Sequence, residues 1–453
     1  MLVIVLGLAV AVLDTTIMNL ALPGITHELH ASAAEAIWVV NAYQIASLVL
    51  LLPLATLGDI VGYRKVYLAG VALFSVASLG AVASTTLGQL IAARTLQGVG
   101  AAGIMSVNAA LVRLIYPRAR LGHGMAVNSM TVATSSVAGP SVAAAILSVA
   151  SWPWLFAINL PLGAVVLALG WRALPHNPAR AAGARISAVD VLLNILMFAL
   201  VFVAADQLGT HEDGTVPGLP PPAAWLMLAV GIAVGVVYMR RQRARAAPLF
   251  PVDLLRIPVF ALSMGTSVTA FCAQTLAYIA LPFLLLDAYG RSHAQAGLLI
   301  TAWPLAIVAM GPVVGRLIGR VADGLLGGIG LALMACGLAL LALLPAQPAN
   351  ADIVWRMALC GMGFGLFQSP NNHTIVTSAP AVRSGAASGM LGTARLTGQT
   401  LGAVLLAGIF SVWSPHSPGD GRGPLIALGL AAACAAVAGV CSTLRMKAAP
   451  AHS

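Results

Sequence analysis

Residues 53–70 read PLATLGDIVGYRKVYLAG, and they join two apolar stretches through a short polar turn. The first apolar stretch ends at Asp59, Gly62 permits a tight turn, and Arg64 and Lys65 open the next apolar stretch. Apolar runs of about 20 residues are long enough to cross a bilayer as helices, and basic residues gather in loops on the cytoplasmic side. This stretch therefore predicts a cytoplasmic turn between two membrane-spanning helices.

The composition of the whole chain agrees with a membrane protein. Of its 453 residues 60% are hydrophobic and only 8% are charged, whereas soluble globular chains carry about 25% charged residues. We therefore expect an all-α integral membrane protein. The first apolar run begins at Met1 without a basic segment and contains Asp14, so we expect a retained helix instead of a cleaved signal peptide, with a few residues missing upstream.

Breaks at proline, glycine and charged residues divide the chain into predicted transmembrane helices. There are fourteen predicted spans: 1–23, 37–57, 66–87, 88–112, 122–150, 152–172, 188–208, 223–239, 257–286, 295–315, 325–345, 353–378, 386–412 and 424–444.

The basic residues test this division. If both termini are cytoplasmic, 18 of the 23 Lys and Arg residues fall in cytoplasmic segments and only Arg291 and Arg422 fall in outside loops. Arg94, Arg356 and Arg395 lie within spans. This is the bias that the positive-inside rule requires. The net charge of +10 is thus explained by topology and indicates no nucleic-acid partner.

Several classes of protein are not expected. The predicted spans leave no room for a soluble domain, and the chain lacks the GxxxxGK[ST] phosphate loop, so we expect no use of ATP. Nothing in the sequence resembles a metal site or a nucleophile–base arrangement. We therefore expect neither an enzyme nor a bound cofactor.

Further motifs accompany the opening stretch. The first half contains LDTTIMNLALP (13–23), LIAARTLQGVGAAG (90–103), SSVAGPSVAAAI (135–146) and SWPWLFAINLPLGA (151–164), and the second half contains GFGLFQSPNN (363–372) and RSGAASGMLGTARLTGQTLGAVL (383–405). In this order and spacing they resemble the major facilitator superfamily, specifically its fourteen-helix drug:proton antiporter branch. The resemblance covers essentially the whole chain.

The chain departs from the family pattern at a few positions. Ala55 stands where the loop motif has a glycine, Ile60 where an arginine is common, and Ala143 and Ala144 where a glycine pair follows the Gly-Pro motif. All but Ile60 exchange one small residue for another, so the helix packing should survive. The two alanines weaken the inference that the fifth helix bends as in the antiporters.

The resemblance implies two six-helix bundles, residues 1–172 and 251–453, joined by a basic connector and an inserted helix pair over 173–250. A partial internal sequence repeat supports this division, because VVGRLIGRVAD (313–323) resembles ATLGDIVGYRK (55–65). Both segments place glycine and arginine in a short turn.

Asp14 is the only charged residue of the first span. A charged group at the centre of a membrane helix costs about 2.5–3.5 kcal/mol, and such residues mark functional sites. Burial raises the pKa of a carboxyl group and a nearby cation lowers it, so a carboxylate under both influences can exchange a proton. The resemblance assigns Asp14 to proton coupling and Arg94 to its control. A structural hydrogen bond or cation recognition remain alternatives for Asp14, and contact with the membrane interface for Arg94.

The resemblance also assigns two mechanical elements. Asp59, Gly62, Arg64 and Lys65 would form a cytoplasmic latch, in which Asp59 faces a helix N-terminus of the other bundle; a solvated cluster is the alternative. Gly139 and Pro140 would form a gating kink, and a simple bend is the alternative.

Polar residues of the predicted cavity are the remaining candidates, and some of them must serve as bonds between helices. The candidates are Asn19, Asn41, Gln44, Gln97, Gln368, Asn371, Asn372 and Arg395.

Together these features predict a monomeric proton-coupled exporter of small amphipathic organic compounds in a bacterial cytoplasmic membrane. A dedicated transporter of one metabolite and a membrane receptor that transports nothing are the alternatives, because fold does not determine cargo.

Overall fold

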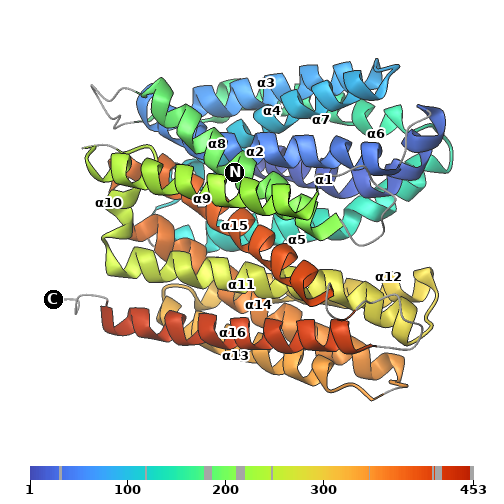
Figure 1. The fold of residues 1–453 in the computed structure, drawn as a ribbon. Coiled ribbons are helices and arrows are strands. Elements are labelled where there is room, and N and C mark those ends of the chain that lie inside the picture. Colours follow the sequence, from blue (N-terminus) through green and yellow to red (C-terminus); the bar gives the residue numbers. More distant parts are fainter. Residues whose placement is uncertain are drawn as a thin grey trace. The chain divides into compact units, whose positions relative to one another are not determined.

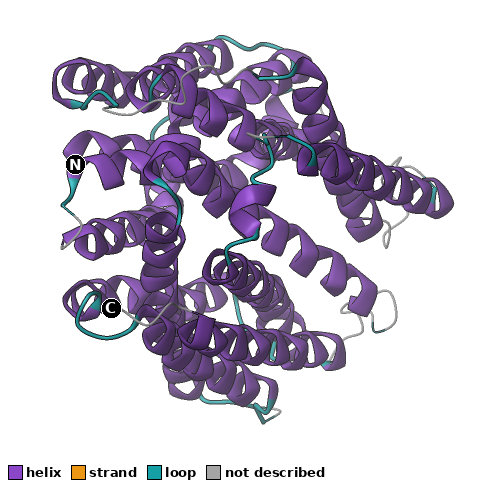
Figure 2. Cartoon of the chain, turned by 90° about the vertical axis from the view of Figure 1, so that its left-hand side faces the viewer, coloured by secondary structure: helices purple, strands orange, loops and turns teal. Residues whose placement is uncertain are grey.

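A computed structural model gives the fold of the chain. The structure describes residues 1–29, 33–117, 120–177, 186–210, 220–245, 248–345, 347–410, 413 and 421–448. These residues are helical almost throughout, and short loops join the helices (Figure 2). Within them there is no β-strand, only an isolated bridge between Ile318 and Val321.

Long helices account for most of the chain. In chain order the α-helices are α1 (Leu2–Glu28), α2 (Ala33–Val61), α3 (Tyr63–Val82), α4 (Leu87–Ile115), α5 (Leu121–Leu147), α6 (Pro153–Ala157), α7 (Asn159–Ala173), α8 (Ala188–Thr210), α9 (Pro221–Arg243), α10 (Val252–Leu255), α11 (Pro258–Phe283), α12 (His293–Leu317), α13 (Asp323–Ala342), α14 (Asn350–Ser378), α15 (Ser384–Phe410) and α16 (Arg422–Ala448).

Each predicted span overlaps one or two of these helices, although 66–87 runs past the end of α3 at Val82. Two spans are composite: 152–172 is made of α6 and α7, and 257–286 is made of α11 and a π-helical turn, Leu284–Ala288. Among the described residues, ten helical segments are long and apolar enough to cross a membrane. The chain is therefore an all-helical membrane protein, and the total of fourteen crossings stays a prediction.

The first compact unit comprises residues 1–199, 234–253 and 379–393. In it α4 packs against α2 and α3, and α1 packs against α5 and α7 (Figure 1). Two tyrosines fix α1 to its neighbours: the hydroxyl of Tyr67 donates to the carbonyl oxygen of Val3 (2.8 Å), and that of Tyr43 donates to the carbonyl oxygen of Ala11 (3.2 Å). These bonds set the face that α1 turns toward the interior of the unit.

The second compact unit comprises residues 200–233, 254–378 and 394–453. Here α14 packs against α12 and α13, and α16 packs against α11 and α13 (Figure 1). The trio α12, α13 and α14 repeats the packing of α2, α3 and α4. This structural repeat agrees with the sequence similarity between residues 55–65 and 313–323.

Glycine permits close helix crossings in both units. A Cβ atom on Gly100 of α4 would lie 2.6 Å from the backbone nitrogen of Phe74 on α3. A Cβ atom on Gly363 of α14 would likewise lie 2.5 Å from the backbone nitrogen of Met334 on α13. Real Cβ atoms do not approach so closely, so the backbones meet only because no side chain intervenes.

Polar side chains hold the parts of α8 and α9 that belong to the first unit, which are residues 188–199 and 234–243. The side-chain amide of Asn194 on α8 donates to the carbonyl oxygen of Val49 on α2 (2.7 Å). Near the start of α8, Asp190 forms an ion pair with Arg241 of α9 (2.5 Å). The predicted division into 1–172, 173–250 and 251–453 stays a prediction about the transporter bundles.

Candidate functional site

Asp14 lies inside the first unit and does not face lipid. Its side chain is 1% exposed, and it points toward α4 and α7. Because a buried carboxylate is stable only when it is paired and hydrogen-bonded, its partners determine what the residue can do.

Arg94 of α4 is the charge partner of Asp14. Its Nη1 donates to Oδ2 of Asp14 (2.5 Å), and its Nε donates to the carbonyl oxygen of Val39 (3.0 Å). The guanidinium also lies 4.3 Å from the ring centroid of Tyr43, which is close enough for a cation–π interaction. Arg94 is fully buried, so it neutralises Asp14 inside the unit and does not reach a membrane interface.

Two amides complete the shell around the carboxylate. Gln97 Nε2 (3.0 Å) and Asn159 Nδ2 (2.8 Å) both donate to Oδ1 of Asp14, and Gln97 Oε1 accepts from Arg94 (2.8 Å). Ser78 accepts from Gln97 through its hydroxyl oxygen (2.8 Å). The groups that reach Asp14 offer it hydrogens and accept none from it. The arrangement therefore fits the ionised carboxylate.

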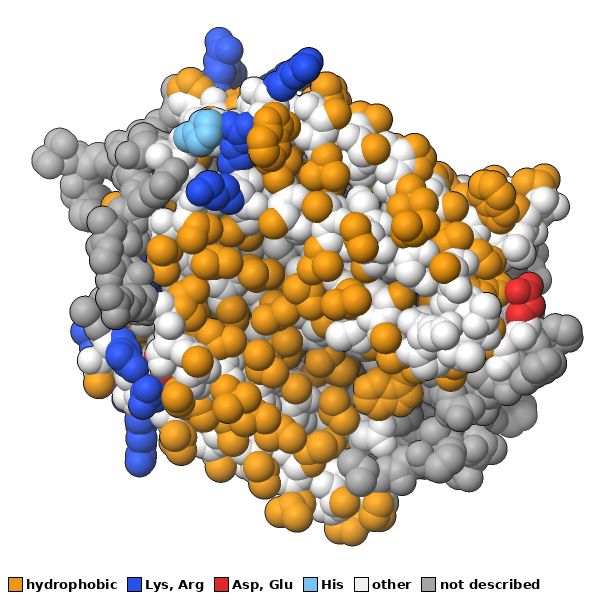
Figure 3. Space-filling view, turned by 90° about the horizontal axis from the view of Figure 1, so that it is seen from above, with side chains coloured by type: hydrophobic (Ala, Val, Ile, Leu, Met, Phe, Trp, Pro, Cys, Tyr) orange, Lys and Arg blue, Asp and Glu red, His pale blue; other side chains and the backbone are white. Residues whose placement is uncertain are grey.

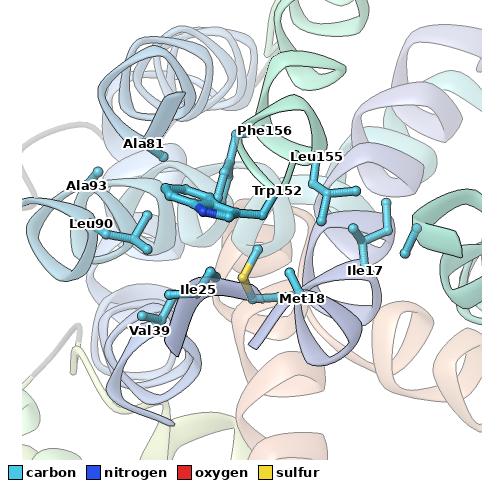
Figure 4. Close-up of a cluster of buried hydrophobic side chains, with 12 residues drawn as sticks. Ile17, Met18, Ile25, Val39, Ala81, Leu90, Ala93, Trp152, Leu155 and Phe156 are labelled. Carbon is cyan, nitrogen blue, oxygen red and sulfur yellow. The ribbon is translucent and has the colours of Figure 1, made fainter. Parts of the chain in front are cut away.

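A hydrophobic cluster covers one side of the ion pair. It contains Ile17 and Met18, which follow Asp14 in the next turn of α1, together with Leu90, Trp152, Phe156 and others (Figure 4). Along α1 the residues of this cluster come after Asp14. Along α4 they come before Arg94, and along α6 they come before Asn159. These residues thus lie toward the end of the unit that is predicted to face outside.

Asp59 at the end of α2 receives the N-terminus of α15. Its Oδ1 accepts from the backbone N–H of Gly385 (2.7 Å), and its Oδ2 accepts from that of Ala386 (3.0 Å). Tyr63 donates its hydroxyl to Oδ1 of Asp59 (2.7 Å). The first N–H groups of a helix have no partner within the helix and favour a negative charge. This geometry is the contact predicted for the latch; the first turns of α15 belong to the same compact unit as Asp59.

The other latch candidates contribute in different ways. Gly62 adopts φ 110°, which favours glycine and lets α3 begin directly after α2. Arg64 turns away from α15: its guanidinium donates to the carbonyl oxygen of Trp171 and lies 3.0 Å from Nε2 of His176. Lys65 is exposed. Asp59 therefore makes the contact with α15 and Gly62 shapes the turn, whereas Arg64 and Lys65 lie beside it.

Gly139 of the predicted gating kink lies against the helix that carries Asp14. A Cβ atom at Gly139 would overlap the side chain of Thr16 on α1. The side chain of Pro140 lies outside the described part of the structure, and α5 remains helical through this position. Gly139 therefore keeps α1 and α5 close together, and a gating role stays a prediction.

A second buried cation lies in the second unit and was not expected there. Arg445, counted by sequence among the cytoplasmic flanking residues, is 3% exposed. Its Nη1 donates to Oδ1 of Asn371 (2.5 Å) and to the hydroxyl of Ser263 (3.1 Å), and its Nη2 donates to the carbonyl oxygen of Asp323 (2.9 Å). It is buried because these oxygen atoms replace the water that would otherwise solvate it.

Comparison with known proteins identifies the family. The model of the family described as Major Facilitator Superfamily matches residues 4–403. The chain belongs to the major facilitator superfamily.

Individual proteins of known sequence or structure resemble the chain over most of its length. An uncharacterized transporter, YebQ, of Escherichia coli (strain K12) is 51% identical over 98% of this chain and 94% of its own length. The multidrug efflux pump LfrA of Mycolicibacterium smegmatis is 30% identical over 91% of this chain and 80% of its own. The crystal structure of the human organic anion transporter MFSD10 has a TM-score of 0.71 at 16% identity, covering 97% of this chain and 98% of that one.

These findings make the chain a multi-pass membrane transporter. Members of the major facilitator superfamily carry small molecules across membranes and are not enzymes. Within the described residues no group of three or more His, Cys, Asp or Glu side chains could hold a metal ion.

The predicted cavity residues of this major facilitator protein divide into three groups. Gln97 and Asn371 do not line an opening in this structure, because both are fully buried and engaged with Arg94 and Arg445. The side chain of Asn19 lies outside the described part. The others stay predictions; Asn41 is buried, and the remaining four, partly exposed, are Gln44, Gln368, Asn372 and Arg395.

Two members of the polar site were missed from the sequence. Ser78 and Asn159 are single polar residues within apolar runs. Such residues are usually expected only to form a hydrogen bond between two helices. The available signal was that Asn159 falls within the quoted stretch SWPWLFAINLPLGA, beside the other motifs.

Proposed function

We propose that the chain is a proton-coupled exporter of small amphipathic organic compounds that works by alternating access. The observation that carries this proposal is the buried carboxylate of Asp14, which is paired with Arg94 and surrounded by hydrogen donors. Similarity to the multidrug efflux pump LfrA supports drug efflux.

Protonation of Asp14 would remove the electrostatic attraction between its carboxylate and Arg94. A neutral carboxylic acid no longer compensates the charge of Arg94, and its own O–H group would face other donors. Leaving one member of a buried ion pair without its partner costs about 3–5 kcal/mol. Uptake of a proton therefore disfavours this packing of α1 against α4 and favours a second arrangement of the helices.

The membrane gradient supplies energy of a comparable size. One charge that crosses 100 mV gains about 2.3 kcal/mol, and a pH gradient adds to it. In the proposed cycle a proton reaches Asp14 from the outside, the cytoplasmic latch at Asp59 opens and closes once, and the cargo leaves in exchange. In this proposal the hydrophobic cluster that includes Ile17 and Met18 would close the outer path until the helices rearrange.

The test is transport into inverted membrane vesicles that contain the full chain. Wild type, Asp14→Asn and Asp352→Asn would be compared with a panel of structurally unrelated neutral and monocationic dyes under an imposed pH gradient. Asp352 is a suitable control because it is another acid of a membrane helix, with a side chain 42% exposed, far from the ion pair in sequence.

We expect Asp14→Asn to insert normally and to lose uptake driven by the pH gradient, while it retains exchange of dye for dye. We expect Asp352→Asn to behave as wild type. Full gradient-driven uptake by Asp14→Asn would exclude Asp14 as the coupling site. Uptake of one compound only would favour a dedicated transporter over a multidrug exporter.

A further inference from the structure

A hollow of about 480 Å³ lies between α3 and α7, beside the turn that starts α3. Its walls are mainly apolar and include Leu68, Ala69 and Ala72 of α3 and Leu167 of α7. Its volume is within the range of pockets that hold drug-sized ligands. Its lining also includes Gly62, Arg64 and Lys65 of the turn, but neither Asp14 nor Asp59 lines it, so the hollow is distinct from both carboxylate sites.

The hollow opens on a surface that is suited to lipid. On the same two helices, Val76, Leu79, Val165 and Trp171 are exposed apolar residues, and Trp171 is 72% exposed. Tryptophan is enriched where a membrane helix meets the headgroups. Figure 3 shows a face of the protein that is largely hydrophobic, with basic and histidine side chains gathered near its edges.

The end of the hollow next to the turn is basic. Arg64, Lys65 and His176 line it, and among the described residues no acidic side chain does. Arg64 is held in place by the carbonyl oxygen of Trp171, and its guanidinium lies 5.8 Å from the Trp171 ring centroid. The nearest acid along the chain, Asp59, directs both carboxylate oxygens to the backbone of α15. The basic end is therefore not neutralised by a carboxylate of its own lining.

We propose that this hollow, the α3–α7 groove, binds an anionic phospholipid of the adjacent leaflet. Arg64 and Lys65 bind the headgroup phosphate, His176 holds the Arg64 guanidinium beside it, and the first part of an acyl chain lies along Leu68, Ala69 and Ala72. The remainder of the lipid stays in the bilayer, since the groove is open on that side. A zwitterionic headgroup is a poorer match, because it brings a cation of its own to a site that already has two.

The groove also places the proposed lipid headgroup next to the turn that precedes α3. Gly62 and Asn177 form part of its wall, and Oδ1 of Asn177 accepts from the backbone N–H of Tyr63 (3.1 Å). Tyr63 in turn donates to Asp59. A bound headgroup thus lies against the residues that hold the start of α3.

Native mass spectrometry of the full chain in mild detergent tests the proposal. The purified protein would be titrated with phosphatidylglycerol, with phosphatidylcholine of the same acyl chains, and with glycerol 3-phosphate, which has the phosphate but no acyl chain. Two charge variants would be compared: Arg64→Gln/Lys65→Gln, and Arg316→Gln/Arg320→Gln as the matched control. Arg316 and Arg320 are exposed basic residues in the corresponding turn of the second unit and lie outside the groove.

A basic residue near a membrane surface contributes about fivefold to the binding of an anionic lipid. We therefore expect Arg64→Gln/Lys65→Gln to bind phosphatidylglycerol about 25-fold more weakly than wild type, and the control to stay within about twofold of wild type. A second variant, Ala69→Phe, fills the groove without a change of charge, and we expect it to lose phosphatidylglycerol as well.

Three results would overturn the proposal. The first is equal binding of phosphatidylglycerol by wild type and by both groove variants. The second is equal affinity of wild type for phosphatidylcholine. The third is displacement of phosphatidylglycerol by glycerol 3-phosphate at matched concentration, which would identify a simple phosphate site. Thermal stability of each variant in detergent, compared with wild type, shows whether a loss of binding is due to misfolding.

Discussion

Asp59→Asn gives a direct measure of the contact between α2 and the start of α15. Asparagine has the shape of aspartate but presents an oxygen on one side and an N–H₂ group on the other. If its oxygen accepts from Gly385, its amide nitrogen faces the N–H of Ala386, 3.0 Å from the position of Oδ2, and two donors oppose each other. The substitution therefore loses one charge-assisted bond and the attraction of the helix N-terminus for a negative charge.

These two losses determine the expected effect. A hydrogen bond to a charged group contributes about 1.5–3 kcal/mol, and the helix-terminus interaction contributes about 0.3–1 kcal/mol. We expect the first turn of α15 to open more easily by about 2–4 kcal/mol, which is roughly a 30- to 700-fold increase in the opening equilibrium.

Amide hydrogen exchange read by mass spectrometry measures this opening. Peptides that cover residues 384–390 should exchange faster in Asp59→Asn by about that factor, while peptides from α11 should not change. Lys65→Gln is the matched control, because it removes a charge from an exposed side chain in the first turn of α3, and the hydrogen bonds to Asp59 come from other residues.

Equal exchange of residues 384–390 in wild type and in Asp59→Asn would refute the reasoning. The two backbone hydrogen bonds that Asp59 accepts from α15 would then contribute nothing to the stability of that turn. Faster exchange in Lys65→Gln as well would show that any loss of charge near Gly62 loosens the contact.

Two further predictions concern packing inside each unit. Arg94→Gln leaves the carboxylate of Asp14 buried without its cation, so we expect a loss of about 3–5 kcal/mol and a clear fall in thermal stability in detergent. Asp14→Asn/Arg94→Gln should recover part of it, and equal stability of the single and double variants would contradict the ion-pair account. Gly363→Ala places a Cβ atom 2.5 Å from the backbone nitrogen of Met334, whereas Gly265→Ala meets nothing within 4 Å. We expect the first to lower thermal stability strongly and the second to leave it unchanged or raise it slightly, and equal behaviour of the two would disprove the close crossing of α13 and α14.

Much of the fold could be predicted from the sequence, because hydrophobic runs of membrane length are a local property. Each predicted span overlaps a helix, and the turn at Gly62 adopts the positive φ that its position suggested. The contact between Asp14 and Arg94 was anticipated only through the family resemblance. Its geometry was not, because it depends on how α1 and α4 cross.

The sequence was least informative about polar partners that are distant along the chain. Arg445 looks like an ordinary flanking residue, because its neighbours in sequence do not reveal that Asn371 and Ser263 will surround it. Ser78 and Asn159 were missed for the same reason. The role of a single polar residue in an apolar run depends on the helix against which it packs, and the sequence does not show which helix that is.

The shell of donors around Asp14 also limits which ions could exchange there. A hard metal cation such as sodium requires several oxygen ligands, but the groups that reach this carboxylate are N–H donors from Arg94, Gln97 and Asn159. The side chain is 1% exposed, so its surface is covered by protein. Exchange of a metal cation at Asp14 would therefore require these N–H donors to move away from the carboxylate first.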